Sequence, residues 1–153
     1  MQGKDGKFYL RHDYENNYSR NGSVFLTCEN SADFSDRYNL LYGHNMLDDS
    51  MFGPLLNYAE DPTYIINHPT FFIACSEGVY EYDIVSYFNV YPDDSMYAIS
   101  YYNKNDYDIL TLNIIASSAR DLGLTLTPDD EIVVLSTCNN NGRLRFVVCG
   151  KKR

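Results

Sequence analysis

The chain of 153 residues suits a single domain with a hydrophobic core, since 44% of its residues are hydrophobic and 15% are aromatic. Its formal net charge of -9 argues against nucleic-acid binding, which needs clustered Lys and Arg to replace counterions. It has no apolar run of about 18 residues, so no segment is predicted to span a membrane. The composition therefore predicts one folded domain, 1–153.

Short β-strands dominate the elements that the sequence predicts. Each is a run of apolar, aromatic or β-branched residues, and turn residues such as Asn21-Gly22 separate them. In chain order, strands are expected at 8–10, 24–26, 40–42, 70–75, 80–90, 96–102, 132–135 and 146–149. About eight short strands favour a closed barrel or a sandwich, and a barrel also removes exposed sheet edges.

The strand at 80–90 is the longest, alternates with a period of two, and is ended by Pro92. One face is expected to carry Tyr80, Tyr82, Ile84, Ser86, Phe88 and Val90, and the other Glu81, Asp83, Val85, Tyr87 and Asn89. This alternation predicts a strand that is buried on one face.

Two helices interrupt the predicted strands. The first is capped within 48–50 and ends before Pro62. Its apolar face consists of Met51, Phe52, Leu55 and Leu56. The second begins near Asp106 and stops before Gly123. Its stripe consists of Tyr107, Leu110, Ile114 and Ser118.

The four cysteines form no CxxC pair, and with only three histidines they predict neither a metal nor a cofactor site. Two disulfides are arithmetically possible. However, Cys28, Cys75 and Cys149 each end an apolar run, a position typical of buried free thiols. Cys138 differs, because it ends an apolar strand directly before the polar loop 139–142.

That position makes Cys138 the candidate nucleophile. A nucleophile needs a rigid backbone behind it and open space ahead, although a core cysteine at a strand end would fit the position equally well. If 132–138 and 145–149 pair as a hairpin, Arg145 lies beside the sulfur and can hold a developing oxyanion. His44 follows another short apolar strand and is a candidate acid/base, but its position also fits an exposed loop residue.

Three motifs, taken together and in this order, resemble those of class B sortases, the cysteine transpeptidases of Gram-positive bacteria. They are Tyr42-Gly43-His44-Asn45-Met46, Leu135-Ser136-Thr137-Cys138 and Arg145-Phe146-Val147-Val148, accompanied by Met51-Phe52 and Leu55-Leu56-Asn57-Tyr58. The similarity extends from about Phe8 to Gly150. It implies a mainly β fold, namely a closed eight-stranded barrel with a few short helices.

The resemblance also assigns roles to individual residues. It implies that Cys138 attacks the substrate, that His44 transfers protons and that Arg145 binds the oxyanion. We further expect Ser136, Thr137 and Asn139, next to the nucleophile, to contact the substrate.

The implied reaction is cleavage of a surface-protein sorting signal after threonine through an acyl-thioester. An amine of peptidoglycan or of its lipid-linked precursor then resolves the thioester. The implied location is the extracellular face of the membrane, with the anchor and the N-terminal helices of the class outside this chain. No cofactor and no nucleic acid take part.

Three alternatives remain at this point. A papain-like peptidase is disfavoured, because there the cysteine opens a helix and precedes the histidine. A pilin-polymerising sortase differs only in using a lysine side chain as the acceptor. A non-enzymatic β-barrel adhesion module would carry Cys138 and His44 incidentally.

Overall fold

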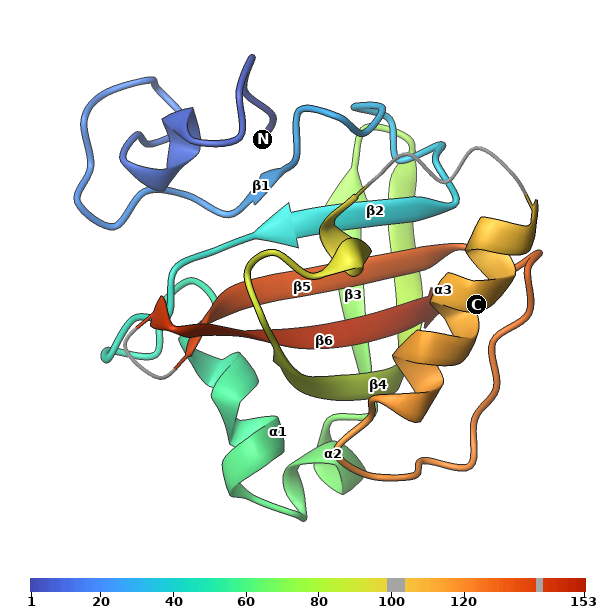
Figure 1. The fold of residues 1–153 in the computed structure, drawn as a ribbon. Coiled ribbons are helices and arrows are strands. Elements are labelled where there is room, and N and C mark those ends of the chain that lie inside the picture. The colour runs from blue at the N-terminus through green and yellow to red at the C-terminus, as the bar shows by residue number, and fades with distance from the viewer. Residues whose placement is uncertain (99–103, 140–141) are drawn as a thin grey trace.

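The computed structural model describes residues 1–98, 104–139 and 142–153, and it is mainly β, as predicted (Figure 1). The strands are β1 (Phe25–Leu26), β2 (Tyr38–Tyr42), β3 (Thr70–Cys75), β4 (Gly78–Val90), β5 (Ile132–Asn139) and β6 (Leu144–Lys152). The α-helices are α1 (Asn57–Glu60), α2 (Tyr64–Asn67) and α3 (Lys104–Ala116), and the 3-10 helices are η1 (Phe8–Leu10), η2 (Gly53–Leu56) and η3 (Ser95–Tyr97). None of these helices is long and apolar enough to cross a membrane.

The strands form one sheet in the order β1-β2-β5-β6-β4-β3. β2 and β5 are parallel, and the other neighbouring strands are antiparallel. Within the described ranges the sheet has six strands and ends at β1 and β3, as a curled half-barrel. The expected closure into an eight-stranded barrel is therefore not confirmed.

A β-bulge in β4 bends the sheet. Ile84 pairs with Gly150, and the next paired residue is Ser86, so Val85 is the extra residue. A bulge of this kind bends its strand and increases the local twist. In Figure 1, β3 and the first part of β4 accordingly run steeply across β2, β5 and β6.

The bulge corrects the predicted alternation of β4. Before it, Tyr82 and Ile84 pack in one hydrophobic cluster, as expected for residues of equal parity. After it, Phe88 and Val90 pack in the other cluster, together with Val85. One inserted residue therefore exchanges the faces of the second half of the strand.

The two clusters lie on opposite faces of the sheet, and the helices cover them. On one face, residues of β2, β5, β6 and β4 pack with η3 and α3; on the other, they pack with η2, α1 and α2. Alternate residues of β5 supply both clusters, Ile132 and Val134 to the first and Val133 and Leu135 to the second. We call these the α3 face and the α1 face.

Two expected strands are wrong as far as the described residues go. At Phe8–Leu10 the chain forms η1, because Asp5 accepts hydrogen bonds from the backbone N–H groups of Lys7 and Phe8 and starts a turn. Within the predicted strand 96–102, Met96 and Tyr97 belong to η3 instead, and the Asp94 side chain caps η3 by accepting from the Met96 N–H. Residues 99–102 of that predicted strand lie outside the described residues.

The predicted helices are present with different limits. The first is η2 followed by α1, and no side chain of 48–50 caps it. α2 was not expected. The second is α3, which buries Tyr107, Leu110 and Ile114 as predicted but ends at Ala116, before Ser118.

Candidate active site at the end of β5

Cys138 and Arg145 are direct partners in the β5–β6 ladder. Side chains of directly paired residues point to the same face and have Cβ atoms about 5 Å apart. Arg143 precedes β6 and is exposed, so the predicted hairpin register is correct. The Arg145 Nη1 donates to the carbonyl oxygens of Gly142 at 3.3 Å and Leu144 at 3.4 Å, which keeps the guanidinium at the mouth of the hairpin.

His44 lies just beyond the paired end of β2. The last pair in the parallel β2–β5 ladder is Tyr42 with Ser136, and the Gly43 N–H then donates to the Ser136 carbonyl oxygen at 3.2 Å. His44 and Cys138 each lie two residues beyond this last pair, so the register places them level, that is, at equivalent positions along the two neighbouring strands. His44, Cys138 and Arg145 therefore occupy consecutive positions across the end of the sheet.

A backbone carbonyl orients the His44 ring. Its Nε2 donates to the carbonyl oxygen of Leu10 at 2.8 Å, and Leu10 belongs to η1 of the N-terminal segment. A neutral imidazole carries one proton, so this bond keeps that proton on Nε2 and leaves Nδ1 free to accept another. No sequence pattern predicts this contact, because it joins residues 34 positions apart through a main-chain atom.

The loop that carries His44 is tightly packed. A Cβ on Gly43 would lie 2.7 Å from the ring of Phe52, so glycine lets that ring approach the backbone. The Phe52 N–H donates to the His44 carbonyl oxygen at 2.9 Å, and Asn45 forms an isolated bridge with Met51. These contacts fix the backbone on both sides of His44.

Two tyrosines lie on the same face as Arg145. The rings of Tyr42 and Tyr97 are stacked with centroids 6.2 Å apart, and the Tyr97 hydroxyl forms a 2.9 Å hydrogen bond with Ser136 Oγ. Burial raises the pKa of Tyr42 to about 12, opposed in part by the Arg145 charge. Burial also raises the pKa of Tyr97, which the Ser136 bond and Arg145 oppose. Both phenols therefore stay protonated to a higher pH than a free tyrosine does.

The three residues predicted to contact substrate do not share one environment. Ser136 has the parity of Cys138 but is 1% exposed and lies beneath Tyr97. Thr137 and Asn139 have the opposite parity. Thr137 is buried and donates to the Gly43 carbonyl oxygen at 2.8 Å, and the Asn139 amide donates to Asn89 Oδ1 at 2.6 Å.

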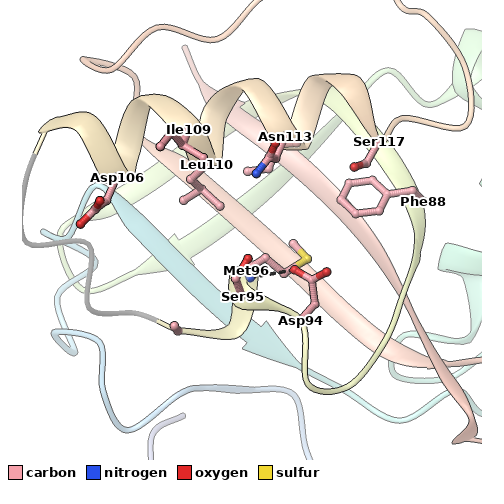
Figure 2. A pocket seen from close by; sticks show the side chains of 11 residues that line it. Phe88, Asp94, Ser95, Met96, Asp106, Ile109, Leu110, Asn113 and Ser117 are labelled. Carbon is pink, nitrogen blue, oxygen red and sulfur yellow. Dashed lines mark hydrogen bonds between the residues drawn. The ribbon is translucent and has the colours of Figure 1, made fainter.

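A cavity of about 370 Å³ opens on the α3 face, between α3 and the segment around η3 (Figure 2). Its lining residues are Phe88, Asp94, Ser95, Met96, Ala98, Asp106, Ile109, Leu110, Asn113, Ile114 and Ser117. Phe88 pairs with Val147, and Val147 pairs with Ser136, so the cavity floor is two strands from Ser136. At a strand spacing of about 4.8 Å, that separation is roughly 10 Å.

All four cysteines are free thiols, but they differ in exposure. Cys149 is fully buried, as expected, whereas Cys75 is only half-buried and Cys28 is exposed, contrary to expectation. Cys138 is partly exposed. Across the described ranges, His, Cys, Asp and Glu side chains form no group of three or more that could hold a metal ion.

The chain is similar to known sortases along its whole length, although no protein-family model matches it. It is 30% identical to sortase B of Listeria monocytogenes over 99% of this chain and 62% of the relative. A solved sortase B from Listeria monocytogenes has a TM-score of 0.89 and 31% identity, covering 99% of this chain and 84% of that one. A Staphylococcus aureus sortase B–substrate complex has a TM-score of 0.91 and 26% identity, covering 100% and 72%.

The alignments cover nearly all of this chain but only part of its curated relatives. The chain spans 62% of the length of the Listeria monocytogenes relative and 57% of that of a Staphylococcus aureus sortase B. At these identities, with nearly the whole chain aligned and the same fold, the chain belongs to the class B sortase family.

Proposed function

We propose that the protein is a cysteine transpeptidase that cleaves the sorting signal of surface proteins after threonine and transfers the protein to a cell-wall amine. The observation that carries the proposal is the direct pairing of Cys138 with Arg145 and the level position of His44 at the end of β2. A nucleophile, a base and a cationic hydrogen-bond donor on neighbouring strands are groups that together can carry out acyl transfer.

In the first half-reaction, His44 takes the thiol proton at Nδ1, since Nε2 is bonded to the Leu10 carbonyl. The Cys138 sulfur attacks the carbonyl carbon of the threonine and forms a tetrahedral oxyanion. When the oxyanion collapses, the C–N bond breaks, His44 gives its proton to the leaving amine, and the acyl group remains on sulfur as a thioester.

In the second half-reaction, the acceptor amine attacks the thioester and loses its proton to His44. The sulfur then leaves and regains that proton. Arg145, which donates to the Gly142 and Leu144 carbonyl oxygens at the mouth of the hairpin, is the proposed donor to the oxyanion of both steps.

The cavity beside α3 is the proposed binding place for part of the sorting signal. Its volume suits a peptide side chain, and it lies on the face to which Cys138 points. Tyr97 of η3 connects the segment that borders the cavity to β5 through its hydrogen bond with Ser136. Ser136 therefore acts by orienting Tyr97, whereas Thr137 and Asn139 are proposed to meet the peptide through their backbone.

Two solved relatives support this choice of partners. One is a Staphylococcus aureus sortase B–substrate complex, and another is a sortase B complexed with Gly3. We infer that the acceptor is an amine of peptidoglycan or its lipid-linked precursor, with a pilin lysine as the alternative. We also infer that the protein works on the extracellular face of the membrane, anchored by a segment outside this chain.

Mass spectrometry tests the proposal. The protein is incubated with a set of candidate sorting peptides, and the expected result is a covalent adduct on Cys138 whose mass equals the peptide up to threonine. Added triglycine should release it as a ligated product, whereas a lysine-bearing pilin peptide that is preferred would favour the alternative. Cleavage that persists in Cys138→Ala would contradict the mechanism.

A further inference from the structure

Beyond the bond from the Gly43 N–H to the Ser136 carbonyl, side chains continue the contact between β2 and β5. In a regular parallel ladder, the next two bonds would run from the Cys138 N–H to the Gly43 carbonyl and from the Asn45 N–H to the Cys138 carbonyl. Instead, the Thr137 hydroxyl donates to the Gly43 oxygen at 2.8 Å, and the Asn45 Nδ2 donates to the Cys138 oxygen at 3.2 Å. Side chains are longer than a backbone N–H, so the strands separate here while remaining bonded.

The separation occurs at the position where His44 and Cys138 lie level. Both residues are partly exposed, so a substrate carbonyl can enter between them. If no hydrogen bond spanned the separated strands, the ends of β2 and β5 could move apart. The distance between the acid/base His44 and the nucleophile Cys138 would then vary. Asn45 spans this gap and contacts the nucleophile's own peptide group.

Asn45 is also the neighbour of His44 in a closed loop. The Phe52 N–H bonds to the His44 carbonyl, and Asn45 and Met51 form a bridge, so His44 and Asn45 move as one unit. The same unit is attached to η1 by the Leu10 bond to the His44 ring. A displacement of Asn45 from Cys138 is therefore a displacement of His44 from the thiol.

We propose that Asn45 is a positioning residue for the transpeptidation, and that its amide sets the separation between His44 and Cys138. This inference rests on the proposed function. Asn45 does not itself touch the reacting atoms; it acts through the Cys138 carbonyl and the His44 loop. Loss of its donor should lower turnover, because proton transfer depends on geometry, and should leave peptide affinity largely unchanged.

The test uses three variants and one control. Asn45→Ala removes the amide; Asn45→Asp keeps its size but offers only acceptors to a carbonyl; Asn45→Gln keeps the donor. The expected kcat is about fivefold to tenfold lower for Asn45→Ala, the range for one neutral hydrogen bond, at least as low for Asn45→Asp, and partly recovered for Asn45→Gln. KM and melting temperature should stay near those of the control Asn67→Ala, a substitution at an exposed position of α2.

A second readout separates positioning from a structural role. The rate of iodoacetamide alkylation, followed by mass spectrometry at the Cys138 peptide, is measured against pH in wild type, Asn45→Ala and His44→Ala. If Asn45 sets the separation between His44 and Cys138, the pH profile of Asn45→Ala should shift from that of wild type toward that of His44→Ala. A loss of stability alone would not move the profile.

The outcomes distinguish this inference from the proposed function. The positioning role is overturned if Asn45→Ala and Asn45→Asp keep the wild-type kcat, or if the alkylation profile does not shift. The proposed function can still hold in that case, with Cys138→Ala inactive. If wild type forms no adduct with any sorting peptide, the proposed function fails, and the alkylation profile still decides whether Asn45 controls the Cys138–His44 pair.

Discussion

Two arginines near the hairpin provide the most direct test of the site. Arg145 is paired with Cys138 in the ladder, whereas Arg143 is exposed and precedes β6. An oxyanion donor must be preorganised, and losing one costs about 100- to 1,000-fold in turnover. Arg145→Ala should therefore lower peptide cleavage by that factor with the fold intact, and Arg143→Ala should have a mild effect. The reverse order, measured in one cleavage assay, would exclude Arg145 as the oxyanion donor.

The three histidines also separate by position. His44 lies level with the thiol, whereas His68 packs on Tyr64 with ring centroids 4.3 Å apart and His12 stacks on Phe8 at 3.9 Å. Replacing His44 by Ala should reduce kcat at least ~100-fold, as expected for loss of acid–base catalysis. His68→Ala is the matched control and should keep most of the activity. Near-normal turnover in His44→Ala would refute its role.

The cysteines should differ in reactivity because of burial. Burial raises the pKa of Cys149, so this thiol stays protonated at pH values where an ordinary thiol is partly ionised, and it is also inaccessible. Alkylation of the native protein at about pH 8.5 should label Cys28 and Cys138, and Cys149 only after denaturation. Early labelling of Cys149, detected by peptide mapping, would contradict its burial.

At the scale of elements, α3 should influence which peptide is accepted. Asn113 points toward the cavity, as Figure 2 shows, while Leu112 next to it is exposed and does not line the cavity. Asn113→Phe should fill the space and change kcat/KM between sorting peptides by roughly tenfold, the effect of one altered apolar contact. Leu112→Phe adds the same ring outside the cavity as a control. Unchanged preference in both variants would show that the cavity does not bind peptide.

Strands with a strong local pattern could be predicted from the sequence, and others could not. The strand at 70–75 matches β3 residue for residue, because a two-residue turn and apolar runs define it locally. Phe8–Leu10 is equally apolar but too short to show an alternation of apolar and polar residues. There the Asp5 side chain accepts backbone hydrogen bonds that favour η1 over a strand. The β4 bulge follows from packing against β6 and leaves no local trace in the alternation.

The candidate active site could likewise be predicted only in part from the sequence. The hairpin loop between the last two strands implied that Arg145 lies beside Cys138, and the register agrees. The level position of His44 depends on the parallel pairing of β2 with β5, which no sequence pattern predicted. Only the family resemblance assigned His44 and Cys138 to the same reaction. Asn45 and the Leu10 carbonyl were missed, because each acts through a hydrogen bond between segments distant in sequence.

At the scale of the whole molecule, the N-terminal segment supports the site from outside the sheet. Gly22 has φ +58°, and a Cβ there would lie 2.6 Å from the Leu10 carbonyl oxygen, the atom that holds His44. Gly22→Ala should therefore displace this carbonyl and lower kcat, in addition to a backbone penalty of about 1 kcal/mol for the left-handed conformation.

Gly123 provides the matched control for that substitution. It has φ +67°, and a Cβ there would have no neighbour within 4 Å, so Gly123→Ala carries a similar backbone penalty without the steric clash. Thermal unfolding and peptide cleavage of the two variants should separate the effects. Equal kcat in both would show that the Leu10 contact does not matter for turnover.

The parallel pairing of β2 with β5 has a consequence for folding. The residues that bridge this pair, such as Asn45 and Cys138, are 93 positions apart, and all of β3, β4 and α3 lies between them. Contacts of such high sequence separation carry a large loop-closure cost and form slowly. During synthesis from the N-terminus, His44 emerges long before Cys138. In the proposed mechanism, the thiol therefore gains its base only when the last strands dock. We therefore expect the nascent chain to be inactive until β5 has paired with β2.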